Sequence, residues 1–206
     1  LCWSIFGRRQ HPGAVGSLVA MALGLGGAVG IFALVGERLR DLFDLGTVAI
    51  GSVYALFGAA TLLGNLAMPW LVRRLGGGRR VMRLALIGVL GAILSVFALP
   101  TPGVVVLALA LLAWAVLGGA GAPALQSHLA GLSPRRRGTL IALGTSALNL
   151  GVAASSAGAG VLYTQGPLGV AGLGMMLLGA AILALHPAPA SAGDAAPRRA
   201  LADDAR

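Results

Sequence analysis

Four long runs without a charged side chain constrain this chain more than any other feature of its sequence. They extend over Pro12–Gly36, Thr47–Val72, Leu84–Pro134 and Gly138–Gly193. An α-helix rises about 1.5 Å per residue and the hydrocarbon core of a bilayer is about 30 Å thick, so one crossing takes about 20 apolar residues. The first two runs are therefore long enough for one crossing each, and the other two for two crossings each.

Turn residues support the division of the two longer runs. Pro100–Gly103 and Thr164–Pro167 lie near their middles and consist of residue types that interrupt helices. The predicted fold class is therefore all-α: a polytopic membrane protein with six transmembrane helices. These are residues 13–35, 47–72, 81–99, 104–126, 139–163 and 168–185, in a bundle that extends over residues 13–186.

Composition agrees with lipid as the solvent of this bundle. The mean hydropathy is +0.90 and charged residues make up 10% of the chain, which lies outside the range of soluble domains. A soluble helical core would need polar faces at helical spacing, and the four runs have none. We expect residues 1–12 to form a cytoplasmic linker. Residues 187–206, rich in Ala, Pro and Asp, have too little apolar surface to fold and are predicted to be a disordered cytoplasmic tail.

Loop charges predict the orientation. Arginine supplies the whole net charge of +9, because the chain has no lysine. One predicted side carries Arg8, Arg9, Arg73, Arg74, Arg79, Arg80, Arg135–Arg137, Arg198 and Arg199. On the other side, the expected loop Glu37–Asp44 balances its arginines with acids. Arginine accumulates on the cytoplasmic side, so we expect a bacterial inner (plasma) membrane protein with both termini in the cytoplasm. Charges confined to loop ends do not suit nucleic acid as a partner.

The beginning of the chain and its one cysteine give further expectations. The chain begins with Leu1 rather than Met, and we expect it to be a fragment of a longer protein; a true start at Leu1 would instead indicate a dimer of halves. Cys2 excludes an internal disulfide, and no Cys/His cluster has metal-ligand spacing. We therefore predict neither a metal nor another cofactor.

Polar side chains within the predicted helices are concentrated in the second and the fifth. Tyr54, Thr61 and Asn65 share one face of the second helix because spacings of seven and four residues keep side chains aligned. Polar residues inside a membrane tend to face the bundle interior or a cavity. The third and sixth predicted helices carry almost no polar side chain, and we expect them to be outer helices that face lipid.

The fifth helix has a similar polar stripe of Thr145, Asn149 and Ser156, with Ser146 adjacent to it. For Asn149 two interpretations stay open, a cavity residue or an interhelical hydrogen bond worth about 0.6 kcal/mol. Trp114, near the middle of the fourth helix, has simple packing as its alternative. Transporters often bind substrate at this depth. The candidate substrate-cavity residues are Tyr54, Thr61, Trp114, Ser146 and Asn149.

Small residues recur at helical spacing on the first and fifth predicted helices. Helices in lipid associate through close backbone approach at such residues. The two expected packing seams are Ala22, Gly26 and Gly30, and Gly144, Gly151 and Gly158.

The stretch from Gly64 to Met82, GNLAMPWLVRRLGGGRRVM, resembles the signature between the second and third helices of each half of the major facilitator superfamily. Within that superfamily it is similar to the drug and sugar efflux (arabinose efflux permease-like) branch. The matching residues are Gly64, Leu71, Arg74, Gly76, Arg79 and Arg80. Arg73 stands where the family has an acidic residue, and Pro69 replaces a usual glycine. These departures are typical of the carboxy-terminal copy.

A second stretch, SPRRRGTLIALGTSALNLG from Ser133 to Gly151, resembles the loop and fifth helix of the carboxy-terminal half of efflux permeases. Together the two resemblances imply a 3+3 inverted repeat and a missing amino-terminal half, or a second half-transporter, as partner. They also imply alternating access by rocking of the halves. The cytoplasmic gating motif would comprise Gly64, Arg73, Arg74, Gly76, Arg79 and Arg80.

The function expected from these resemblances is secondary active transport, with efflux of a small drug-like or sugar-like compound. We expect no Asp, Glu, Lys or Arg within the crossings, so a residue for proton coupling would lie outside this chain. An uptake permease, a membrane scaffold and a channel stay open. An intramembrane serine protease would need a Ser–His pair; Ser146 lacks a following glycine, and His186 lies at a helix end. We therefore predict that the chain is not an enzyme.

Overall fold

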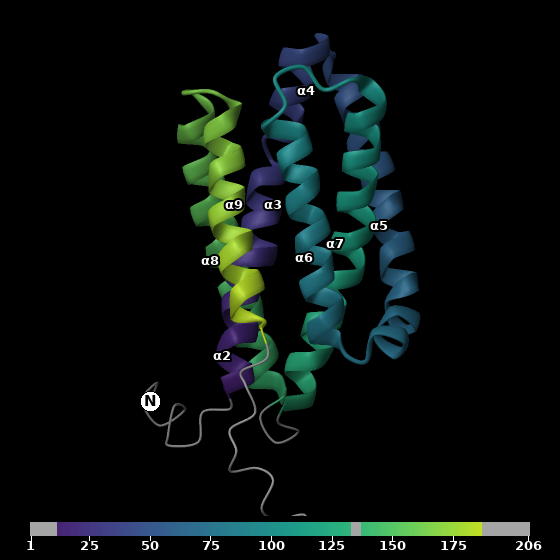
Figure 1. Cartoon of the computed structure of the whole chain (residues 1–206), viewed down its shortest axis with the longest axis vertical. Helices are drawn as coiled ribbons and strands as arrows, with labels where there is room; N and C mark the ends of the chain where they lie inside the picture. The colour runs from purple at the N-terminus through teal and green to yellow at the C-terminus, as the bar shows by residue number, and fades with distance from the viewer. Residues whose placement is uncertain (1–11, 133–136, 187–206) are drawn as a thin grey trace, which may run out of the picture.

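The chain is built of helices that lie side by side along its long axis (Figure 1). A computed structural model describes residues 12–132 and 137–186, and the predicted linker and tail lie almost wholly outside them. No strand occurs in these two ranges. The elements are α2 (Pro12–Val19), η1 (Ala20–Gly26), α3 (Gly27–Phe32), α4 (Val35–Phe43), α5 (Thr47–Leu75), α6 (Gly78–Phe97), α7 (Val104–Leu132), α8 (Arg137–Tyr163) and α9 (Pro167–Ala184).

Six helical stretches in the described residues are long and apolar enough to cross a membrane. The first combines α2, the π-helical segment η1, α3 and α4, and the other five are α5 to α9. The predicted all-α membrane fold is confirmed at this level, and five of the six predicted ranges match the observed helices to within six residues. The described chain begins and ends at the same end of the bundle (Figure 1).

The first crossing is longer than the sequence predicts. After a turn at Ala33 and Leu34 it continues as α4 to Phe43, so the expected loop Glu37–Asp44 is helical in all but its last residue. Charged residues suggested a loop, but α4 is amphipathic: Val35 and Leu39, four residues apart, are buried on one side. The connection to α5 is therefore only Asp44 to Gly46.

Arg38 of α4 is 6% exposed and joins the first crossing to the end of α6. Its Nε donates a hydrogen bond to the carbonyl oxygen of Val96 at 3.1 Å, and one terminal nitrogen donates to those of Leu99 and Pro100 at 2.7 and 3.1 Å. The last carbonyl groups of a helix have no partner within it and carry partial negative charge. Arg38 therefore caps α6 with a full positive charge.

The helices form two groups. In one, α7 lies along α5 and α6; in the other, η1 and α3 lie along α8, and η1 also lies against α9. The groups meet where α6 packs on α9 and where α7 packs on α8. The third and sixth crossings, expected to be outer helices, differ within the bundle: half of the most apolar part of α6 is buried, and 28% of that of α9. The most exposed crossings are α5 and α8, with 17% and 11% buried.

The two predicted glycine seams pack against each other. A side chain at Gly26 would meet the backbone of Leu148 and Gly151 of α8, and one at Gly151 would meet the backbone of Ala22. The hydroxyl of Ser155 donates to the Gly26 carbonyl at 3.0 Å across this contact. Close backbone approach thus holds η1 on α8, as small-residue interfaces do in membranes.

The turn between α5 and α6 depends on glycine. Gly76 ends α5 with φ of 73°, and the N–H groups of Gly76 and Gly77 both donate to the carbonyl of Val72 at 3.1 Å. Gly77 then adopts φ of 139° immediately before α6. Residues with a Cβ rarely adopt these angles, so the glycine run that resembles the family signature serves a local backbone purpose.

Candidate functional site

A cavity of about 240 Å³ lies between the first crossing, α5, α6 and α7. Its walls are mostly apolar, with Met82 and Leu86 of α6 on one side. Aromatic rings and two polar side chains give it chemical character: Phe32, Phe57, Trp114, Thr61 and Asn65. Glycines of α7 widen it because they bring no side chain into the space.

The aromatic rings form one cluster centred on Phe32. The ring centroid of Phe32 is 4.1 Å from that of Phe57 and 5.6 Å from that of Trp114, which meets it edge-on at 73°. Tyr54 adds a further edge contact to Phe32 at 5.2 Å. Rings in such arrangements attract each other by about 0.5–1.5 kcal/mol per pair beyond area burial, and Phe32, Phe57 and Trp114 all line the cavity.

The polar groups of this site are few. The hydroxyl of Thr61 donates to the Phe57 carbonyl within α5 at 2.8 Å, so its remaining capacity toward the cavity is as an acceptor. The hydroxyl of Tyr54 accepts a hydrogen bond at 2.9 Å from the backbone N–H of Gly36. Asn65 contributes an amide at the cavity edge. Such a site suits a largely apolar molecule with one or two hydrogen-bonding groups.

The structure brings together three of the five predicted cavity residues. Thr61 and Trp114 line the cavity, and Tyr54 adjoins it through Phe32. Ser146 and Asn149 lie on the exposed surface of α8 and do not line it.

Sequence reasoning missed Phe32 and Phe57, because it followed polar side chains and, for Trp114, depth in the helix. A signal was present in α5. Phe57 is three residues after Tyr54 and four before Thr61, which places all three on one helix face. Phe32, on a different crossing, could be assigned to the cavity only from the packing.

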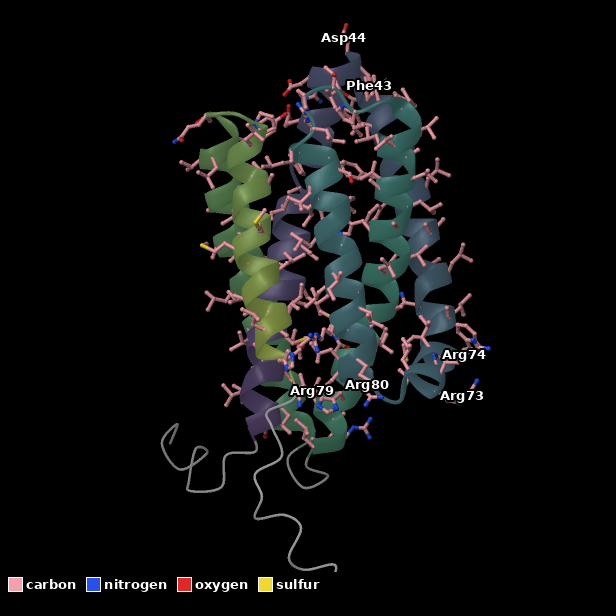
Figure 2. All side chains as sticks on the ribbon, viewed as in Figure 1. Phe43, Asp44, Arg73, Arg74, Arg79 and Arg80 are labelled. Atoms are coloured by element: carbon pink, nitrogen blue, oxygen red, sulfur yellow. The ribbon has the colours of Figure 1, made fainter. Side chains whose placement is uncertain are left out.

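The arginines of the predicted gating motif, Arg73, Arg74, Arg79 and Arg80, lie at one end of the bundle, opposite Asp44 (Figure 2). Gly64 lies within α5 instead, where it packs against the backbone of Val116 on α7. Arg73 and Arg74 are exposed at the end of α5, with the Arg74 guanidinium 5.1 Å from the ring centre of Trp70.

Arg79 and Arg80 belong to the first turn of α6. Arg80 is exposed and donates to the Leu75 carbonyl at 3.3 Å. Arg79 is half-buried, and its guanidinium lies near Gly16 of α2. Arg83 corrects the expectation that the crossings hold no charged side chain, because it lies in the second turn of α6, half-buried and inside the predicted range 81–99.

Within residues 12–132 and 137–186, no group of three or more His, Cys, Asp or Glu side chains is placed to hold a metal ion. The cavity walls carry no ionisable side chain in this part of the chain. The chain matches no protein-family model and no solved structure.

Proposed function

We propose that this chain forms one six-helix half of a secondary active transporter of the major facilitator type, and that the complete transporter exports a small organic compound by alternating access. The observation that carries the proposal is the way in which two segments of three crossings exchange partners. One segment runs from α2 to α6, and the other from α7 to α9.

In both segments, the first crossing packs against the second and third crossings of the other segment. The first crossing of the second segment, α7, packs along α5 and α6, the second and third crossings of the first segment. The first crossing of the first segment likewise packs along α8 and α9. Sequence neighbours α5 and α6 touch each other little. This interlocking supports a 3+3 inverted repeat, in which corresponding helices run in opposite directions.

Backbone details support the same repeat. Each second crossing ends in a turn that leads to a glycine directly before the next helix: Gly77 with φ 139° and ψ 154°, and Gly166 with φ 124° and ψ 160°. The two turns lie at opposite ends of the bundle (Figure 1). Each exchange also has a glycine contact at its centre, Gly64 with α7 and Gly151 with η1.

The exposed polar stripe of α8 supports a partner half. Thr145, Ser146 and Asn149 are exposed within a crossing, and polar side chains are costly in contact with lipid. On α5, Asn65 is exposed in the same way. We propose that a second half covers these faces, so that Ser146 and Asn149 line a central cavity between halves.

The lining of the 240 Å³ cavity favours a particular substrate class. Sugars need several hydrogen-bond donors and acceptors, and the described walls offer little beyond Thr61 and Asn65. Aromatic rings suit a flat, lipophilic compound. We therefore propose a drug-like aromatic substrate, exported across a bacterial inner membrane whose cytoplasmic side holds the arginine-rich end. There, Arg73 and Arg74 would contact the other half and stabilise one state.

Transport of a lipophilic aromatic dye by the full-length protein in proteoliposomes tests this function. Phe57→Leu removes an aromatic ring from the cavity wall, and we expect the dye concentration at half-maximal transport to rise about fivefold. Asn149→Ala should change affinity or substrate range. Both variants should keep wild-type abundance in the membrane. Phe43→Leu and Gln165→Ala, outside the 240 Å³ cavity, are matched controls.

Dye movement that is equal with wild-type protein and with empty liposomes would overturn the proposal. A loss of abundance in Asn149→Ala would show that this residue holds the bundle together instead. Dye accumulation in the opposite direction, into vesicles of known orientation, would assign uptake rather than export.

A further inference from the structure

A second cavity, at the arginine-rich end, has a character opposite to that of the aromatic site. It measures about 340 Å³ and lies where the start of α6 faces α7 and the end of α9. Its walls are the turn Gly76–Gly78, three arginines of α6, a histidine of α7 and one leucine. The side chains are Arg79, Arg80, Arg83, His128 and Leu185.

This pocket concentrates positive charge, and among the residues that the structure describes none that lines it is acidic. The ion pair found in the described residues joins Arg40 to Glu37, both on α4 at the opposite end of the bundle (Figure 1). Partly buried like charges in a small volume raise the free energy of the folded protein unless an anion compensates them.

Two buried polar atoms in the pocket have no hydrogen-bond partner in this part of the chain, Nε of Arg79 and Nε2 of His128. Nearly all buried polar groups in proteins are paired, so each exception needs an explanation. The guanidinium of Arg79 can only donate, which requires an acceptor oxygen. A ligand with several acceptor oxygens would satisfy these atoms together.

The backbone adds donors to the same space. Gly77 precedes α6 and no side chain caps the helix there. The N–H groups of Arg80 and Val81 donate to the Gly77 carbonyl at 3.2 Å, which leaves those of Gly78 and Arg79 without a helical partner. Helix N-termini favour anions. A Cβ built at Gly77 meets nothing within 4 Å, so the approach to this turn is open.

We propose that this pocket binds a phosphate group, supplied by the headgroup of an anionic phospholipid. Guanidinium groups match phosphate oxygens in paired hydrogen bonds. The source follows from position, because the pocket opens at the end of a membrane-crossing helix, where headgroups lie and where basic pockets between helices hold anionic lipids. This binding does not depend on the transport proposal.

Lipid retention by the full-length protein tests the site. The protein is reconstituted in nanodiscs of phosphatidylglycerol and phosphatidylcholine in equal amounts, and the lipids that stay bound after extraction are counted by native mass spectrometry. We expect enrichment of phosphatidylglycerol on the wild-type protein. Arg79→Gln and Arg80→Gln should each lower that enrichment about fivefold. Arg73→Gln, which removes the same charge outside the pocket, should leave it unchanged.

A second measurement separates the possible phosphate sources and does not require a buried variant. In lipid-free detergent, inorganic phosphate should raise the midpoint of thermal unfolding less than short-chain phosphatidylglycerol does. A response to inorganic phosphate alone would overturn the lipid as the source. Equal losses of phosphatidylglycerol in Arg73→Gln and Arg80→Gln would show that the enrichment comes from general surface charge, and would overturn the pocket as the binding site. No enrichment on the wild-type protein would overturn the proposal outright.

Discussion

The two ends of the bundle use arginine in contrasting ways. At the end formed by α4, Arg38 is surrounded by three carbonyl oxygens and Arg40 pairs with Glu37 at 2.8 Å. At the other end, the pocket arginines and Arg73 have no carboxylate partner among the described residues. The contrast separates charges that hold the fold together from charges that are available to a ligand.

The α4 end also joins the two three-crossing segments. The hydroxyl of Tyr163, the last residue of α8, donates to the carboxylate of Asp41. The Tyr163 ring contacts Phe97 at the end of α6 edge-on, with centroids 6.4 Å apart. Together with Arg38 these contacts tie α4, α6 and α8, so we expect this end of the bundle to move as one body.

The largest effect should come from Arg38→Met. This substitution keeps much of the side-chain volume but leaves the carbonyls of Val96, Leu99 and Pro100 without their charged donor, and hydrogen bonds to charged groups contribute about 1.5–3 kcal/mol each. We expect a loss of about 3 kcal/mol in the free energy of unfolding, measured by denaturant titration in detergent.

Arg40→Met is the matched control for that measurement. Arg40 is exposed, and its pair with Glu37 is worth about 0–1 kcal/mol. Equal losses of unfolding free energy in Arg38→Met and Arg40→Met would show that Arg38 stabilises the fold no more than an exposed arginine does.

An intermediate effect is expected for Tyr163→Phe. The substitution removes the hydroxyl that donates to Asp41 and keeps the ring on Phe97, so it isolates the hydrogen bond. We expect about 1 kcal/mol of destabilisation. In the double-mutant cycle with Asp41→Ala, additive losses would show that the pair contributes nothing to the tie between α4 and α8.

The smallest effect should be a stabilisation by salt that is specific to the arginine-rich end. Like charges on exposed side chains are screened over about 10 Å at 0.1 M salt. In lipid-free neutral detergent, added sodium chloride should therefore raise the unfolding midpoint of the wild-type protein slightly. In the double variant Arg73→Gln, Arg80→Gln the rise should shrink, and an unchanged rise would place the repulsion elsewhere in the protein.

The sequence was sufficient for the number and approximate range of the crossings, because about 20 apolar residues per crossing is a strong signal in lipid. It was not sufficient for α4, because charged residues mark a loop end and an amphipathic helix equally well. The role of Arg38 depends on carbonyl groups 58 to 62 positions away in the chain. Only the packing of α6 brings them into reach.

The candidate site was predictable in part for a related reason. Tyr54 and Thr61 could be grouped because helical spacing aligns them, and Trp114 because of its depth. The ring of Phe32 joins them through packing between crossings, which no spacing within one helix encodes. The resemblance to an efflux permease concerns two loops and their helices, so it carries no information about this aromatic cluster.

The seven-residue π-helical segment η1 lies between the α2 end and the α4 end of the first crossing. A π-helical turn holds more residues than an α-helical turn, so η1 sets the angular phase of α3 relative to α2. Deletion of one residue there would rotate one side against the other by roughly 100°, the angle per residue of an α-helix. After that rotation, the contact of Gly26 with α8 and the hydrogen bonds of Arg38 could not both form while Gly16 stays near Arg79. The wide π-helical turn therefore allows one crossing to pack against three neighbours, α8 and α9 along η1 and α3, and α6 along α4.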